Sequence, residues 1–132
     1  MPSMYSEWVR QRFVAFQASA GEVVYIGDPL DVGDYEEIFV QVDVVGSNAA
    51  TNDDVTWTVE TSISADNFPK WDPCFAARAL SKTAGTSDPV RITNSSTNPL
   101  RKWIRLPITH AVATANQVVT LHVSVLLKKR VP

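Results

Sequence analysis

Hydrophobic and polar residues alternate along several stretches of the chain, and the alternation is clearest near its C-terminal end. From residue 119 to residue 127 every second position is apolar, and the positions on this side are Val119, Leu121, Val123, Val125 and Leu127. Successive side chains of a β-strand point to opposite faces, so this spacing predicts a strand with one buried and one solvent-facing side. Leu126 is the one apolar residue on the predicted outer face.

Three other stretches show the same period of two. The positions predicted to face the core are Ile38, Val40, Val42 and Val44 in the first stretch, Val55, Trp57, Val59, Thr61 and Ile63 in the second, and Ile104, Leu106 and Ile108 in the third. Pro107 interrupts the third stretch. Because proline has no N–H to donate, this strand is predicted to lie at a sheet edge or to carry a bulge.

Weaker segments complete a predicted set of about eight strands. These segments are residues 8–18, 22–26, 75–82 and 89–93. Residues 75–82 also have helical propensity, so one short helical turn is the alternative there. Loops rich in Gly, Pro, Asn and Asp separate the segments, and no crossover helices are expected. This pattern favours an all-β antiparallel β-sandwich, with a jelly roll as the leading topology, in one domain over residues 1–132.

The composition is that of an ordinary globular domain. The chain has 132 residues, of which 45% are hydrophobic and 20% charged, and its formal net charge is -2. A net charge this close to zero argues against a nucleic acid or a membrane surface as the partner. Glu7, Arg10 and Arg12 interrupt the apolar run that a secretion signal needs. We therefore expect a protein that stays soluble in the cell that makes it.

Residues that usually carry chemistry are few and scattered. Cys74 is the single cysteine, and we interpret it as a small packed hydrophobe. His110 and His122 are too far apart in the sequence for the short spacing of a zinc site, and His122 falls on a polar strand face. No glycine cluster leads into a helix, so no phosphate-binding loop is expected. The sequence predicts no metal site and no cofactor.

Two groups of acidic residues are further candidates. Asn52, Asp53 and Asp54 are adjacent instead of alternating, which is typical of a polar loop and not of a calcium site. Glu60 and Asp66 resemble a pair of carboxylates for glycoside hydrolysis. Glu60, however, is predicted on a solvated strand face among threonines, a poor place for a catalytic acid. We therefore expect a protein that is not an enzyme.

The N-terminal segment departs from the one-sided pattern. Large apolar residues occur on both of its predicted faces, with Trp8, Val14 and Phe16 on one and Val9, Phe13 and Ala15 on the other. A strand that is apolar on both sides needs two surfaces to cover it. Residues 1–18 are therefore predicted to act as an N-terminal arm or a swapped strand that contacts a neighbouring subunit.

Aromatic residues next to arginines are typical of protein interfaces. The residues that we expect to contact a partner are Trp8, Arg10, Arg12, Phe13 and the basic end Lys128, Lys129 and Arg130. Among the other tryptophans, Trp57 is predicted in the core, whereas Trp71 and Trp103 are candidates for an interface or for a sheet edge.

A series of motifs runs through the middle and the end of the chain. Residues 59–68 read VETSISADNF and precede Trp71, residues 102–106 read KWIRL, and the closing strand ends in basic residues. Over residues 36–130 this series resembles small virion proteins of tailed phages, in particular head decoration (cement) proteins with a jelly-roll β-sandwich.

The resemblance implies a structural virion protein that binds and stabilises the head shell. It also implies a homotrimer made in the host cytoplasm, with the major capsid protein or another virion protein as partner. A component of the phage tail or baseplate is an alternative.

The same motifs are also similar to those of discoidin-type carbohydrate-binding modules. That second resemblance implies that Trp71 stacks on a sugar ring and that Arg105 or Asp66 hydrogen-bonds the sugar hydroxyls. The chain differs from that family in two respects. Asn67 stands where a glycine is usual, and the flanking cysteines of many secreted modules are lacking.

Overall fold

The structure of this chain is a computed structural model that describes residues 5–16, 22–48, 54–66, 70–93, 99–110 and 118–129. For residues 5–16 it describes the backbone alone. All regular elements in these ranges are β-strands, and every strand pair is antiparallel. The all-β antiparallel prediction is confirmed. In this part of the chain no helix is long and apolar enough to cross a membrane.

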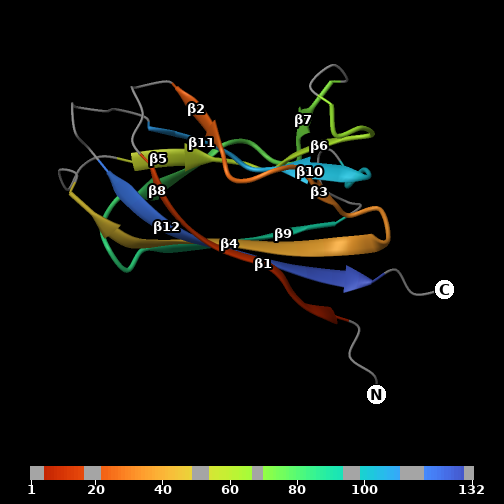
Figure 1. Ribbon diagram of the computed structural model, residues 1–132, viewed down its shortest axis with the longest axis horizontal. Helices are drawn as coiled ribbons and strands as arrows, with labels where there is room; N and C mark the ends of the chain where they lie inside the picture. The colour runs from red at the N-terminus through yellow and green to blue at the C-terminus, as the bar shows by residue number, and fades with distance from the viewer. Residues whose placement is uncertain are drawn as a thin grey trace.

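One layer of the molecule is a single four-stranded sheet (Figure 1). In spatial order its strands are β1 (Tyr5–Phe16), β12 (Val119–Lys129), β4 (Tyr35–Ser47) and β9 (Ser87–Ile92). The two longest alternating stretches of the sequence are neighbours here, with Val123 opposite Val42 and Val125 opposite Val40. Cross-strand pairs of β-branched residues on one face stabilise such a sheet.

The other layer consists of two short four-stranded sheets placed end to end (Figure 1). The first contains β2 (Val23–Tyr25), β11 (Pro107–His110), β5 (Asp54–Trp57) and β8 (Arg78–Ser81). The second contains β3 (Leu30–Asp31), β10 (Trp103–Arg105), β6 (Glu60–Ser62) and β7 (Asp72–Pro73). Only Leu106 separates β10 from β11, and only Thr58 and Val59 separate β5 from β6. The two sheets are therefore halves of four strands that are each interrupted near the middle.

If each interrupted strand of the second layer is counted once, the two layers together contain eight strands, and their order is a recognisable one. In sequence order, strands 1, 8, 3 and 6 form one layer and strands 2, 7, 4 and 5 form the other. Consecutive strands thus pass from one layer to the other along most of the chain. This wrapped order is the topology of a jelly roll, which confirms the predicted β-sandwich with about eight strands.

The interruption of the second layer corrects the prediction made for Pro107. Its strand does not lie at an edge, because β11 pairs with β2 on one side and with β5 on the other. Proline cannot donate a ladder hydrogen bond, and the strand is broken immediately before it, at Leu106. The backbone groups at the break still have partners, since Ile26 N–H donates to the Leu106 carbonyl at 3.0 Å.

The interior between the layers is filled by the residues that the alternation predicts. All five inner positions of β12 are buried, as are the inner positions predicted for β4, β10 and β11. In the second stretch the inner positions Val55, Trp57, Val59 and Thr61 are buried. Ile63 is the exception, with 73% of its surface exposed. Strand β6 ends at Ser62 and the chain bends over the next residues, so the alternation no longer applies at Ile63.

Residues 75–82 contain strand β8 and not a helical turn. Leu80 is buried, and its Cα pairs with that of Val55 in β5. Cross-strand packing therefore overrides the helical propensity of this segment.

Candidate docking surface

The four N-terminal residues predicted to contact a partner all lie on β1. Their backbone positions pair with β12, with Trp8 opposite Leu126, Arg10 opposite Val125, Arg12 opposite Val123 and Phe13 opposite His122. Their side chains lie outside the described part of the structure, so these contacts remain predictions. The structure does place this strand at one edge of its layer (Figure 1).

The basic C-terminal residues do not form one free cluster. Lys128 Nζ lies 3.6 Å from Glu36 Oε1 and 3.5 Å from Glu37 Oε2, so its charge is matched within the chain. Glu37 also accepts a hydrogen bond from Arg91, and this bond holds the pKa of Glu37 below its ordinary value. Lys129 is exposed, and Arg130 lies outside the described residues.

The described residues hold no group of three or more side chains suited to a metal ion. Cys74 is buried in the core, and burial raises the pKa of its thiol to about 12, as expected of a packed, unreactive cysteine. His122 Nδ1 lies 3.6 Å from Asp43 Oδ2, on the polar face predicted for it. Of the three adjacent residues considered for calcium, Asn52 and Asp53 lie outside the described residues.

The two carboxylates considered for glycoside hydrolysis have separate partners. Glu60 accepts a hydrogen bond from Arg105 Nε at 2.7 Å. Asp66 accepts a hydrogen bond from the Ser64 hydroxyl at 3.3 Å, and its carbonyl accepts one from the Trp71 indole at 3.0 Å. Each carboxylate is thus held in a local contact of its own.

Arg105 is the centre of a cluster of side-chain contacts on the outer face of the second layer. Its guanidinium carbon lies 4.5 Å from the centre of the Tyr25 ring and 4.4 Å from the centre of the Trp71 ring. Together with the ion pair to Glu60, these contacts hold the guanidinium in one place. Cation–π contacts of this kind combine with the ion pair because the arginine fork is planar.

The alternation along β10 and β11 determines which residues share this outer face. Ile104, Leu106 and Ile108 are buried, so residues 103, 105, 107 and 109 point away from the core. Tyr25 is opposite Pro107, and Val23 is opposite Thr109, which places both on the same face. Val23 is 47% and Tyr25 46% exposed.

We call this surface the aromatic face, and it consists of Val23, Tyr25, Trp103, Arg105 and Pro107. Trp103 is half-buried, and the Lys102 ammonium lies 5.7 Å from the centre of its ring. The face thus combines exposed apolar groups, aromatic rings and an arginine that is already fixed. Tyrosine, tryptophan and arginine are the residues most enriched at protein–protein contacts.

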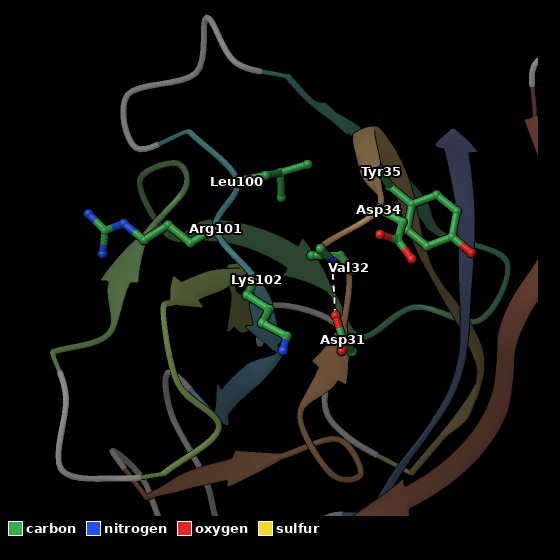
Figure 2. Close-up of a pocket in the computed structure, with 8 residues that line it drawn as sticks. Asp31, Val32, Asp34, Tyr35, Leu100, Arg101 and Lys102 are labelled. Atoms are coloured by element: carbon green, nitrogen blue, oxygen red, sulfur yellow. Dashed lines mark hydrogen bonds between the residues drawn. The ribbon is translucent and has the colours of Figure 1, made fainter. Parts of the chain in front are cut away.

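A surface pocket of about 530 Å³ adjoins one end of the aromatic face (Figure 2). It lies between the turn that joins β3 to β4 and the residues before β10, and the side chains that line it are mostly polar. Asp31 shares the end of the face because its Cα pairs with that of Trp103. Its carboxylate accepts a hydrogen bond from the Gly33 N–H at 2.9 Å, which fixes the turn. The Arg101 side chain points out of the pocket (Figure 2). It pairs with Asp72 at 2.8 Å.

Trp71 is not arranged as a platform for a sugar ring. Only 9% of its surface is exposed, and the Arg105 guanidinium lies against its ring. Its indole N–H is also used, since it donates to the Asp66 carbonyl. The stacking surface implied by the resemblance to carbohydrate-binding modules is therefore occupied by the chain itself.

Sequence reasoning did not identify Val23 and Tyr25 as surface residues. Strand β2 has only three residues, so its alternation is too short to show which side is buried. The pairing with β11 determines the side, and that pairing joins segments far apart in the sequence.

Comparison with known proteins gives no independent indication of function. No protein-family model matches the sequence, and no curated protein matches it either.

Proposed function

We propose that this chain is a structural, non-enzymatic domain that docks onto another protein, and that it serves as a decoration protein on the head of a phage virion. The observation that carries the proposal is the aromatic face. Val23 and Tyr25 are about half exposed beside an arginine that is held by two rings and an ion pair. Such a combination favours a protein partner over a small substrate.

The fixed position of Arg105 supports a docking role on energetic grounds. A long side chain loses rotamer freedom when it is immobilised at an interface, at a cost of about 0.5–1.5 kcal/mol. In this protein Tyr25, Trp71 and Glu60 already hold the guanidinium in the free molecule. Only 16% of the Arg105 side chain is exposed, so the guanidinium serves mainly to hold the exposed Tyr25 ring in place, and less of this ordering cost remains to be met on binding.

The assignment to a virion rests on the motif resemblance and on the fold together. Jelly rolls occur in viral capsid proteins but also in lectins and cupins, so the fold alone is only an analogy. The proposed partner is the major capsid protein, which presents the same surface many times. Many copies of a modest interface can stabilise a shell without catalysis.

The presence of the protein in particles tests this proposal. Virus particles produced from the genome that encodes the chain would be purified and their proteins counted by quantitative mass spectrometry. We expect the chain in many copies per particle, in a fixed ratio to the major capsid protein. Particles that lack the chain, while infected cells contain it, would overturn the virion assignment.

A further inference from the structure

The open edges of the sandwich differ in how well they can accept another strand. A strand at an edge has unpaired N–H and C=O groups, and proline or short length normally keeps such an edge from pairing. Strand β9 carries Pro89, and β7 carries Pro73. Strand β8 has four residues. Strands β2 and β3 have three and two residues and are separated by a bend that contains Gly27 and Pro29.

Strand β1 has neither of these protections. It has 12 residues and no proline. From Arg10 to Phe16 it forms seven consecutive pairs with β12 without a register shift, and the irregular positions are confined to Tyr5–Arg10. In the described part of the chain β1 pairs with β12 alone (Figure 1). Its other side therefore presents a regular row of backbone groups that another strand can bond.

We propose that the open edge of β1 pairs antiparallel with β1 of a second copy of this chain. The contact would join the first layers of two molecules into one continuous eight-stranded sheet. Such a contact is two-fold symmetric, because the same strand contributes the same groups on both sides. It is independent of the aromatic face, which lies on the other layer.

A second copy fits this edge better than a foreign segment does. Two identical edges cover each other over the regular stretch Arg10–Phe16, whereas a foreign strand would cover β1 and leave its own second edge open. A pairing centred on Phe13 also avoids like charges: it places the Cα of Arg10 opposite Phe16 and that of Arg12 opposite Val14. Like charges directly opposite each other destabilise a strand pair.

A contact of this kind fixes the number of chains in the assembly. Pairing through one two-fold edge closes at two chains. The resemblance to decoration proteins implies three chains instead. The mass of the assembly that the full chain forms in solution therefore distinguishes a dimer from a trimer. We expect twice the chain mass of 14.6 kDa.

Two proline variants of the full chain test the edge directly. Adjacent residues of an antiparallel strand send their N–H groups to opposite sides. Of Gln11→Pro and Arg12→Pro, one therefore removes an N–H that bonds β12 and the other removes an N–H on the open edge. The matched controls are Gln11→Ala and Arg12→Ala, which keep both N–H groups.

Sedimentation and denaturant unfolding would be measured for all four variants. We expect one proline variant to unfold as wild type does while its dimer dissociates at least tenfold more readily, and both alanine variants to remain dimers. The proposal is overturned by a wild-type chain that stays monomeric at high micromolar concentration. A trimer, or a dimer that a well-folded edge-side proline leaves intact, overturns it as well.

If both proline variants unfold, amide hydrogen exchange of the wild-type chain tests the same pairing without a substitution. Dilution should remove protection at every second residue between Arg10 and Phe16, because only those N–H groups bond the second copy. Protection of this stretch that is unchanged by dilution would contradict the proposed pairing.

Discussion

Asp88 shows how a single side chain joins the two layers. It lies on β9 of the first layer, is buried, and accepts three hydrogen bonds from the second layer: one from the Trp57 indole at 2.9 Å and two from Arg78 at 2.8 Å. The Trp57 ring also packs edge-on against Phe75 with centres 5.4 Å apart. A charged group at this depth is stable because both carboxylate oxygens have donors.

We expect Asp88→Asn to lower the free energy of unfolding by about 1–2 kcal/mol at pH 7. The amide cannot accept the paired bonds from Arg78, and solvent around the half-exposed arginine limits the loss. Urea unfolding measures the change. Asp34→Asn, at an exposed aspartate, is the control and should change stability little.

The effect of Asp88 should depend on pH. The hydrogen bonds from Arg78 hold the pKa of Asp88 below its ordinary value in the folded protein. As the pH falls, the unfolded chain therefore takes up its proton first, so the stabilisation is complete above about pH 4 and disappears as the pH falls through the lower folded pKa. The stability difference between wild type and Asp88→Asn should narrow toward pH 2. A difference that stays constant would show that the carboxylate charge contributes nothing.

Cys74 gives a second prediction at this scale. Its thiol is buried and its pKa is raised to about 12, so at pH 8 almost no thiolate is accessible to a reagent. We expect a disulfide reagent to label the chain at the rate of unfolding in buffer and at once in denaturant. Rapid stoichiometric labelling of the native chain would contradict the packed position of Cys74.

Among the elements, β12 is the one that the sequence predicts best, and the reason is physical. It is a central strand between β1 and β4, and its inner face is buried from Val119 to Leu127, so the period of two is unbroken over these residues. Strands of two to four residues carry too few positions to display a period, which is why the division of the second layer was not foreseen. Pro107, which interrupts the central strand of this layer, was recognised. The sequence does not show whether that strand is central, because this depends on which strands pair with it.

The aromatic face was only partly predictable for a related reason. Trp103 and Arg105 alternate with the predicted core residue Ile104, which predicts that they lie on the outer face, and the structure agrees. Their neighbours Tyr25 and Trp71 come from strands and loops that only the fold brings together. A sequence pattern gives the face on which a residue lies, whereas the set of residues that meet there depends on strand order.

Two opposite substitutions on β12 test the assignment of its faces. Val123→Thr places a hydroxyl in the apolar core and should lower the free energy of unfolding by about 1–3 kcal/mol. Thr120→Val makes the reverse change on the outer face and should stay within about 0.5 kcal/mol. Both variants keep a β-branched residue, so strand propensity is matched. Equal losses, measured by denaturant unfolding, would contradict the assigned faces.

On the scale of the whole molecule, the two proposed contacts lie on different layers. The aromatic face belongs to the layer that contains β2, β10 and β11, and the open edge of β1 belongs to the layer that contains β12 and β4. Self-association through β1 therefore leaves the aromatic face free on both copies. Two linked faces bind a repeated surface more tightly than one does, provided that their spacing matches the repeat.

Docking of the aromatic face onto the capsid can be measured as binding of matched variants to purified capsids. Val23 on this face and Val45 on the outer side of β4 are 47% and 50% exposed, so Val23→Lys and Val45→Lys make the same change at similar exposure on opposite layers. Binding of each variant to capsids purified without this protein would be titrated. We predict saturable binding of wild type and Val45→Lys, and at least tenfold weaker binding of Val23→Lys, a loss of about 1.4 kcal/mol. Equal binding of both variants, or no binding of the wild-type chain, would contradict the account.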